Sequence, residues 1–393
     1  MMRKSLLLFS LLALVMSSKA QTDKKLLTFD DILEWHRITD KHISDNGDLL
    51  VYKSEPWKGD SQLHIQNLED GTENSFRGGT SPYLAPDGSL VVFPILPTEH
   101  TTRTWKIKGE KEADKPFKKL AIFNAQTQTT DSINHFEKLI NPTNWSGWVA
   151  YLLSPEDKAD TNKAYNQENG YLLTLHHLPS GTLKNYPYVT EVAFSEDGLK
   201  LGFISSGDEQ SNFKAGLYHI DLKQDIQTQI VKGKLNLANM GWNKEADRLA
   251  FVADTSANDK DYQLYLWEDE QLRNLVNNNT KSMPQNWELS KNGKVLFSPS
   301  GDRLFIGIAP KQVPKDTTVL EEEIPVIDVW HWNEPTLHSQ QLNTLERDLK
   351  KSYTAVFDLT ENTLVPLESK DFTGFSLIKE GDADYALAWS HMP

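Results

Sequence analysis

One pattern recurs along the chain: a short turn, usually containing glycine, is followed directly by a strand of alternating apolar residues. Clear copies of the turn are Ile43–Gly47, Ala85–Gly88, Phe194–Gly198 and Phe297–Gly301, and weaker copies are Asn144–Gly147 and Trp242–Asp247. Glycine suits such a turn because it adopts positive φ without steric cost. The turn anchors, with Ala246 in the fifth, lie 41 to 59 residues apart. That spacing is typical of β-propeller blades.

Each turn and its strand are followed by a second predicted hairpin. These hairpins span Leu63–Phe76, Leu120–Ile133, Leu172–Tyr186, Leu217–Ile230, Leu264–Val276 and Ala355–Leu367. Two hairpins per repeat make a four-stranded blade. The sequence therefore predicts an all-β fold, a β-propeller with six complete blades.

A seventh unit begins near the end of the sequence. Phe372–Leu377 is predicted to be its first strand, Lys379–Asp384 its turn and Tyr385–Trp389 its second strand. A propeller protects its strand edges by closing into a ring. We therefore expect a propeller over residues 21–393 that ends within a blade, as a fragment of a longer protein would.

Helix signals are scarce. Thr28 can cap a short helix that extends to Ile38, with acidic residues in its first turn. A second helix is expected over Thr336–Lys350, inside an insertion of the sixth blade that also holds a strand-like segment, Val326–Trp332.

The first twenty residues have the layout of a signal peptide. Arg3 and Lys4 precede the apolar run Ser5–Met16, and Ser18-Lys19-Ala20 fits a cleavage site. A buried N-terminal helix is the alternative. Because no cysteine follows the cleavage site, a lipoprotein anchor is excluded. We expect residues 1–20 to be removed and the protein to be exported, to the periplasm or the outside of a bacterium.

Composition narrows the possible partners and cofactors. The chain has 41 basic and 55 acidic residues, a net charge of −14, which argues against nucleic acid or an anionic membrane surface as its partner. Beyond the signal segment, no apolar run is long enough to span a membrane. The absence of cysteine excludes disulfides, zinc–thiolate sites and a cysteine nucleophile.

A search for catalytic motifs finds none. Gly198 and Gly202 have the glycine spacing of a Gly-x-Ser-x-Gly nucleophile elbow, but Lys200 lies between them. The dinucleotide, P-loop and His-Glu-x-x-His motifs are also absent. We therefore assign no catalytic, cofactor-binding or metal-binding residue and expect no cofactor.

Three weaker clusters remain, each with a structural alternative. His176 and His177 are adjacent on a strand, so their rings face opposite sides, and structural roles are favoured over metal binding. The carboxylates and amide of a loop could bind Ca²⁺ or simply be solvated; these residues are Asp254, Asn258, Asp259 and Asp261. Glu321–Glu323 could bind a substrate amine or form a charged surface loop.

The blade turns resemble those of TolB-like propellers. Leu27–Trp35, leading into Ile43–Gly47, is similar to the start of secreted prolyl oligopeptidase-family serine peptidases of Bacteroidetes type. Asp328–Trp332, followed by Tyr353–Leu359, also resembles that group's propeller. The resemblance implies an N-terminal propeller that screens the active site, followed by an α/β-hydrolase domain with Ser, Asp and His.

No triad residue of that family can be placed on this sequence. We therefore expect a substrate-gating propeller portion of a serine peptidase, inactive alone, whose peptide substrates are processed by the missing hydrolase domain. The alternative is a stand-alone TolB-like envelope propeller that binds a protein. A third possibility is a propeller hydrolase with its own central site, which would need converging carboxylates or metal ligands.

Overall fold

The computed structural model describes residues 26–111, 114–155, 164–233, 236–254, 261–277, 279–312, 319, 323, 331–334, 336–372 and 374–390. The expected signal peptide, the strand-like Val326–Trp332 for the most part, and parts of two candidate clusters lie outside these residues. The chain divides into two compact units, Met1–Ser132 and Ile133–Pro393, which are described separately.

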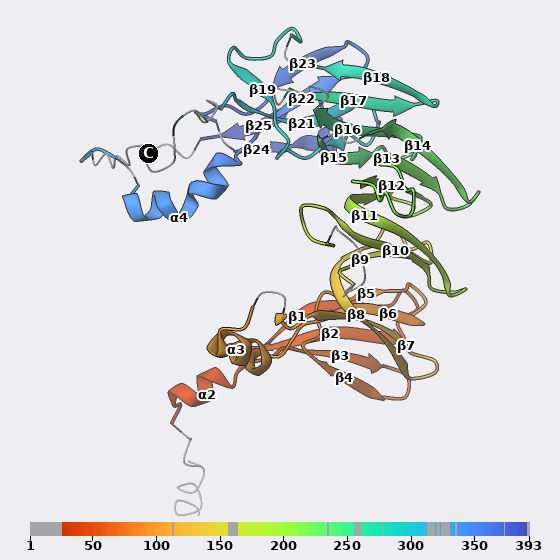
Figure 1. Ribbon diagram of the computed structural model, residues 1–393. Helices are drawn as coiled ribbons and strands as arrows, with labels where there is room; N and C mark the ends of the chain where they lie inside the picture. Colours follow the sequence, from red (N-terminus) through yellow and green to blue (C-terminus); the bar gives the residue numbers. More distant parts are fainter. Residues whose placement is uncertain are drawn as a thin grey trace, which may run out of the picture. The chain divides into compact units, whose positions relative to one another are not determined.

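The first unit contains two modules of antiparallel strands. The first module is β1 (His36–Ile43), β2 (Leu49–Pro56), β3 (Gln62–Asn67) and β4 (Glu73–Arg77), paired in that order. The second is β5 (Tyr83–Leu84), β6 (Leu90–Ile95), β7 (Lys118–Asn124) and the start of β8 (Thr129–Ile140). In Figure 1 the strands of the first module lie side by side in chain order, as in a propeller blade.

The second unit continues the same pattern. Its first two modules are formed by the end of β8, β9 (Trp148–Leu153), β10 (Tyr171–His177), β11 (Thr182–Phe194), β12 (Lys200–Ser205), β13 (Gly216–Asp221) and β14 (Ile226–Lys232). The long strand β11 serves both modules, since its first half pairs with β10 and its second half with β12. The register of β11 shifts between Val189 and Glu191, where its pairing changes from β10 to β12.

Two further modules and a hairpin follow. The fifth module is β15 (Asn236–Trp242), β16 (Arg248–Asp254), β17 (Tyr262–Glu268) and β18 (Gln271–Val276). The sixth contains β19 (Trp287–Leu289), β20 (Leu296–Phe297), β21 (Arg303–Pro310), β22 (Tyr353–Asp358) and β23 (Thr363–Pro366), with β19 and β20 both paired to β21. The hairpin of β24 (Gly374–Leu377) and β25 (Ala386–Trp389) follows. Among the described residues, the prediction of six blades and a seventh begun is confirmed; the first five blades have four strands each, and the sixth has five because β19 and β20 both pair with β21.

Apolar residues from neighbouring modules share common cores. In the first unit, Val51 and Leu63 pack with Val91 and Phe123. In the second unit, the fifth and sixth modules share the largest of these cores, to which the fifth contributes from β16, β17 and β18 and the sixth from β21, β22 and β23. The modules are therefore stabilised by burial against one another, as expected of a repeat architecture.

The helices differ in part from expectation. The helix α2 (Phe29–Leu33) has the predicted Thr28 cap but ends before Ile38. Ile38 instead lies in β1, opposite Ser54, because strand pairing takes over that segment. The helix α4 (His338–Leu349) confirms the second prediction.

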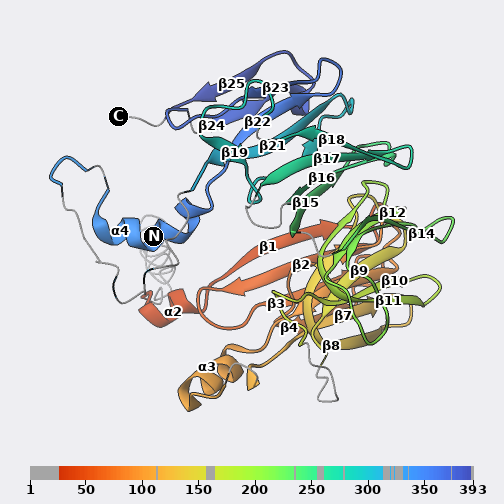
Figure 2. The ribbon, with the colours of Figure 1, turned by 45° about the horizontal axis from the view of Figure 1, so that its top comes forward.

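The helix α3 (Glu99–Lys108) was not predicted. It lies in the connection between β6 and β7, and its orange ribbon is distinct in Figure 2. Thr98 caps its start, and Gly109 ends it with φ +62°. These two end signals are in the sequence, but none of the helix residues is buried, so no apolar stripe marks it.

Candidate functional site

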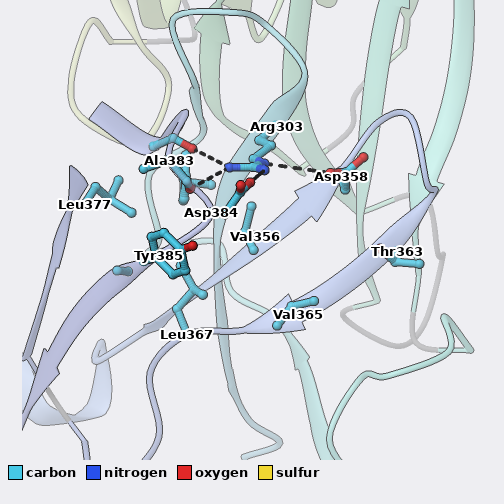
Figure 3. A pocket seen from close by; sticks show the side chains of 13 residues that line it. Arg303, Val356, Asp358, Thr363, Val365, Leu367, Leu377, Ala383, Asp384 and Tyr385 are labelled. Carbon is cyan, nitrogen blue, oxygen red and sulfur yellow. Dashed lines mark hydrogen bonds and ion pairs between the residues drawn. The ribbon is translucent and has the colours of Figure 1, made fainter. Parts of the chain in front are cut away.

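The β24–β25 hairpin is attached to the sixth module by Arg303 of β21. The Arg303 guanidinium donates hydrogen bonds to the carbonyl oxygens of Gly381 (3.0 Å) and Ala383 (2.8 Å) and to Asp384 Oδ1 (3.1 Å). Its Nε lies 3.8 Å from Asp358 Oδ2 on β22. Figure 3 shows Arg303 between Ala383 and Asp384 on one side and Asp358 on the other. One side chain therefore connects the turn of the hairpin to two strands of the sheet.

A second connection joins the turns of the two elements. The backbone N–H of Ser300 donates to both carboxylate oxygens of Asp382, at 3.0 and 3.2 Å, and the Ser300 hydroxyl donates to Oδ1 at 2.8 Å. Hydrogen bonding from this hydroxyl is the main cause that lowers the pKa of Asp382 from its usual range. Gly381 packs so closely on Phe305 that a Cβ there would lie 2.4 Å from the ring.

Beyond these contacts the hairpin and the sixth module line an open groove of about 280 Å³, which we call the β23–β25 groove. Its lining comprises Arg303, Phe305, Val356, Asp358, Thr363, Val365, Leu367, Leu377, Gly381, Ala383, Asp384, Tyr385 and Ala386. In Figure 3, Val356 of β22 and Val365 of β23 lie along its floor, and Tyr385 lies on the hairpin side.

Strand alternation explains the character of this groove. On β22, Ala355 and Phe357 are buried in the core shared with the fifth module, so Val356 between them faces the opposite side. On β23, Leu364 is buried in the same core and Val365 is 50% exposed. The groove therefore has a partly open apolar floor beside the carboxylates of Asp358 and Asp384.

The contacts of His64 show whether a serine–histidine relay exists on the first module. His64 Nδ1 lies 2.5 Å from Glu73 Oε1 and 3.1 Å from the Ser75 hydroxyl. A relay needs the serine hydroxyl and the orienting carboxylate on opposite ring nitrogens of the histidine base, with an oxyanion hole nearby. Here both partners contact the same nitrogen, so Ser75 is not activated in that manner.

The adjacent histidines of β10 contact different aromatic rings. His176 packs edge-on to Tyr151, whereas His177 packs on Trp148 and its Nδ1 lies 2.7 Å from the Ser180 hydroxyl. The strand thus holds the two rings in separate contacts. Among the residues described, no group of three or more His, Asp or Glu side chains is placed to hold a metal ion.

The other two candidate clusters are described only in part. Asp254 is buried, where it accepts hydrogen bonds from Asn236 Nδ2 and the Asp261 backbone N–H, both at 3.3 Å. Asn258 and Asp259 lie outside the described residues, as do Glu321 and Glu322. The structure therefore does not test either loop as a whole.

Two titratable side chains in the second unit have shifted pKa values that sequence reasoning did not predict. Burial, the largest cause, raises the pKa of Glu191, whose two carboxylate oxygens accept from the backbone N–H groups of Asn239 and Met240 at 2.9 Å each. Burial also lowers the pKa of His219 to about 4, where its ring packs against Trp242 and Trp267. Both side chains lie between neighbouring modules. Their burial comes from packing between modules, so a sequence pattern does not predict the pKa shifts.

The comparisons with known proteins give low-level matches to solved structures. No family model matches the sequence, and no curated protein matches it. Among solved structures, dipeptidyl peptidase 4 from Porphyromonas gingivalis shares 12% identity at a TM-score of 0.44, over 94% of this chain and 52% of that one. The chain thus spans about half the length of that peptidase.

Two other solved structures match this chain over most of their own length. The β-propeller domain of the Trilobed protease from Pyrococcus furiosus shares 9% identity at a TM-score of 0.37, over 88% of this chain and 90% of that one. Oligogalacturonate lyase from Vibrio parahaemolyticus shares 10% identity at a TM-score of 0.38, over 89% and 80%. In the part of the chain that the structure describes, no helix has the length and apolar character needed to cross a membrane.

Proposed function

We propose that this chain is the propeller portion of a secreted prolyl oligopeptidase-like serine peptidase, which gates peptide access to a hydrolase domain and is not catalytic itself. The observation that carries the proposal is the tandem series of antiparallel modules, together with the two segments that resemble this family. One segment, Leu27–Trp35, leads into β1, and the other, Tyr353–Leu359, contains β22.

The chemistry of the described side chains supports a non-catalytic role. Acyl transfer needs a serine activated by a histidine and an oxyanion hole beside it. His64 and His177 each contact a serine hydroxyl, but Glu73 occupies the same nitrogen of His64, and Ser180 belongs to the tight turn after β10. In such an enzyme the modules would act as a screen that keeps folded proteins from the active site and restricts its substrates to peptides.

Labelling with a fluorophosphonate probe tests this function. Purified residues 21–393 should remain unlabelled and should not hydrolyse chromogenic Pro- or Ala-peptides above background. The protein immunoprecipitated from its native host should be a polypeptide longer than 393 residues that the probe labels. Stoichiometric labelling of a serine within residues 21–393 would place the active site in the propeller instead.

A second candidate is a stand-alone TolB-like propeller that binds a protein in the bacterial envelope. The β23–β25 groove favours it, because a partly open apolar floor beside an exposed strand is typical of a binding surface. A host polypeptide that ends near residue 393 and resists the probe would support this candidate over the peptidase.

Export belongs to the same proposal. The order of charged, apolar and small residues over the first twenty positions predicts cleavage after Ala20. Mass spectrometry of the protein from its host should therefore find Gln21, open or cyclised, at the amino terminus. A mature protein that retains Met1 would contradict export by this route.

A further inference from the structure

We propose that the insertion containing α3, together with the β2–β3 connection beside it, binds the surface of a lipid bilayer that carries anionic headgroups. This surface belongs to the first unit, and its role does not depend on whether the chain is part of a peptidase. The proposal rests on the local charge, on exposed apolar side chains and on the contacts that fix the orientation of α3.

The charge of the α3 insertion is opposite to that of the chain. Residues 99–119 contain seven basic and four acidic residues, a net charge of +3, whereas the whole chain has −14. Arg103, Lys106 and Lys111 are exposed, and none of them forms an ion pair with another described residue. The net acidity argues against an anionic partner for the molecule as a whole, but a local basic surface can still direct one end of it towards such a partner.

One face of α3 combines basic and apolar side chains. Lys106 and Ile107 follow Arg103 by three and four positions, so the three side chains share a face of the helix. Ile107 is 71% exposed, and no residue of α3 is buried. Lys108, next to this face, lies 3.4 Å from Glu110. The described part of the chain therefore leaves the basic and apolar face of α3 uncovered.

Trp105 on the opposite side of the helix fixes the direction of that face. Its Nε1 donates a hydrogen bond to the Lys111 carbonyl oxygen at 3.2 Å, and Lys115 Nζ lies 5.8 Å from the centre of its ring. The chain that follows α3 thus folds back over Trp105. In Figures 1 and 2, α3 projects beyond the ends of the strands of its unit, so its outer face is accessible to a large surface.

The β2–β3 connection adds an exposed tryptophan to the same end of the unit. Asp60 of this connection accepts a hydrogen bond from the Glu99 backbone N–H at the start of α3, at 2.6 Å, and also pairs with Arg77 at 2.6 Å. Three residues before Asp60, Trp57 is 82% exposed. The ion pair and the hydrogen bond therefore hold Trp57 near the beginning of α3.

Each exposed apolar side chain of this surface has a lysine next to it in the sequence. Lys58 follows Trp57, two lysines flank Ile107, and Lys118 follows Phe117, which is 42% exposed. At a bilayer surface, apolar side chains enter the boundary of the acyl chains while lysine amines remain near the phosphates. Tryptophan is also favoured at this boundary. A soluble polyanion would pair with the lysines but would leave the apolar side chains in water.

The other exposed amphipathic helix lacks this combination. Leu342 of α4 is 58% exposed, but the basic residues of that helix are balanced by acidic ones. Lys350 pairs with Glu346 at 2.6 Å, and Arg347 lies 3.5 Å from Asp348. An anionic bilayer should therefore attract the α3 insertion rather than α4.

Flotation with vesicles tests the proposal. Purified residues 21–393 should float with phosphatidylcholine vesicles that contain about 30% phosphatidylglycerol, and at least about tenfold less with phosphatidylcholine alone or in about 0.5 M salt. The double variant Lys106→Gln/Lys108→Gln should lower the partition coefficient at least about tenfold. Ile107→Ser should lower it about fivefold, because less apolar surface leaves water.

Matched variants in the second unit are the controls. Lys223→Gln/Lys232→Gln removes the same charge from exposed positions, and Leu342→Ser removes an exposed apolar side chain from α4. Both should float as the wild type does. Self-associated protein without lipid sediments instead of floating, so it is not counted as bound.

Three results would overturn the proposal. They are absence of flotation, equal losses in the control variants, and flotation that does not require phosphatidylglycerol. Binding to soluble polyglutamate that Ile107→Ser leaves unchanged, without flotation, would indicate an acidic protein as the partner instead. Fluorophosphonate labelling is scored on separate samples, so failure of the peptidase function and failure of this inference are distinguishable.

Discussion

At the scale of single residues, carboxylates hold neighbouring modules together at irregular points of their inner strands. Glu191 accepts the backbone N–H groups of Asn239 and Met240, where the register of β15 shifts and Asn239 has a φ of +48°. In the first unit, Asp40 accepts the backbone N–H of Ser81 at 3.4 Å. These acceptors satisfy donors that a strand irregularity leaves outside the sheet.

Substitution of Glu191 tests this role. Glu191→Ala would leave two backbone donors without their acceptor and is expected to lower the free energy of unfolding by about 1–3 kcal/mol. Because burial raises its pKa, the group favours the folded state most below the ordinary carboxyl pKa, and this contribution is lost as the pH rises through the raised value. Urea unfolding of wild type and Glu191→Gln should show their stability difference shifting against wild type as the pH rises; the opposite slope would contradict the assignment.

His219 is expected to destabilise the fold in mild acid. Its pKa is lowered from 6.5 to about 4, first by burial and then by Lys200, with Asp221 opposing. The neutral ring is therefore favoured in the folded state, and its contribution is present above pH 6.5 and lost as the pH falls towards 4. At most about 3 kcal/mol is involved for one group. His219→Phe should keep the contacts with Trp242 and Trp267 and flatten the melting temperature between pH 6.5 and 4.5; an unchanged slope would show that other groups control it.

At the scale of the elements, the turn that marks each repeat has two physical requirements. The anchor residues have positive φ, as predicted, and even Ala246 has a φ of +58°. The turns also meet across modules: the Asp45 N–H donates to the Pro86 carbonyl, and the Asn144 N–H donates to the Glu196 carbonyl. The sequence pattern reveals the first requirement but not the second, which depends on packing.

Gly181 and Gly198 allow the two requirements, positive φ and close packing between turns, to be tested separately. Gly181 and Gly198 have nearly equal φ values, +70° and +69°, but a Cβ at Gly181 would meet nothing within 4 Å. A Cβ at Gly198 would lie 2.5 Å from Ser146 Oγ and 2.7 Å from the Pro142 ring. Gly181→Ala should cost about 1 kcal/mol, from backbone strain alone, and Gly198→Ala about 2–4 kcal/mol, because overpacking adds to the same strain. Equal shifts in thermal unfolding would show that the close approach does not matter.

At the scale of the whole molecule, the repeat was predictable from sequence because each module uses the same local pattern. Strand alternation and turn glycines predicted the second hairpin of each of the six modules and the β24–β25 hairpin. The helix α3 was missed because an exposed polar helix has no apolar period. The contacts of Arg303 were also missed, since residues some eighty positions apart come together only through the fold.

The exposed edge of β25 leads to a last prediction about association in solution. Purified residues 21–393 should self-associate with rising concentration, because an exposed strand edge with apolar side chains templates strand pairing. Leu387→Lys places a charge on this edge and should reduce the association, as charged edge residues do in natural sheets. Leu272→Lys, at an exposed leucine of β18, adds the same charge away from β25 and is the control. Light scattering distinguishes the cases: equal suppression by both variants would attribute the effect to net charge, and a monodisperse wild-type monomer would mean that the β25 edge is already satisfied.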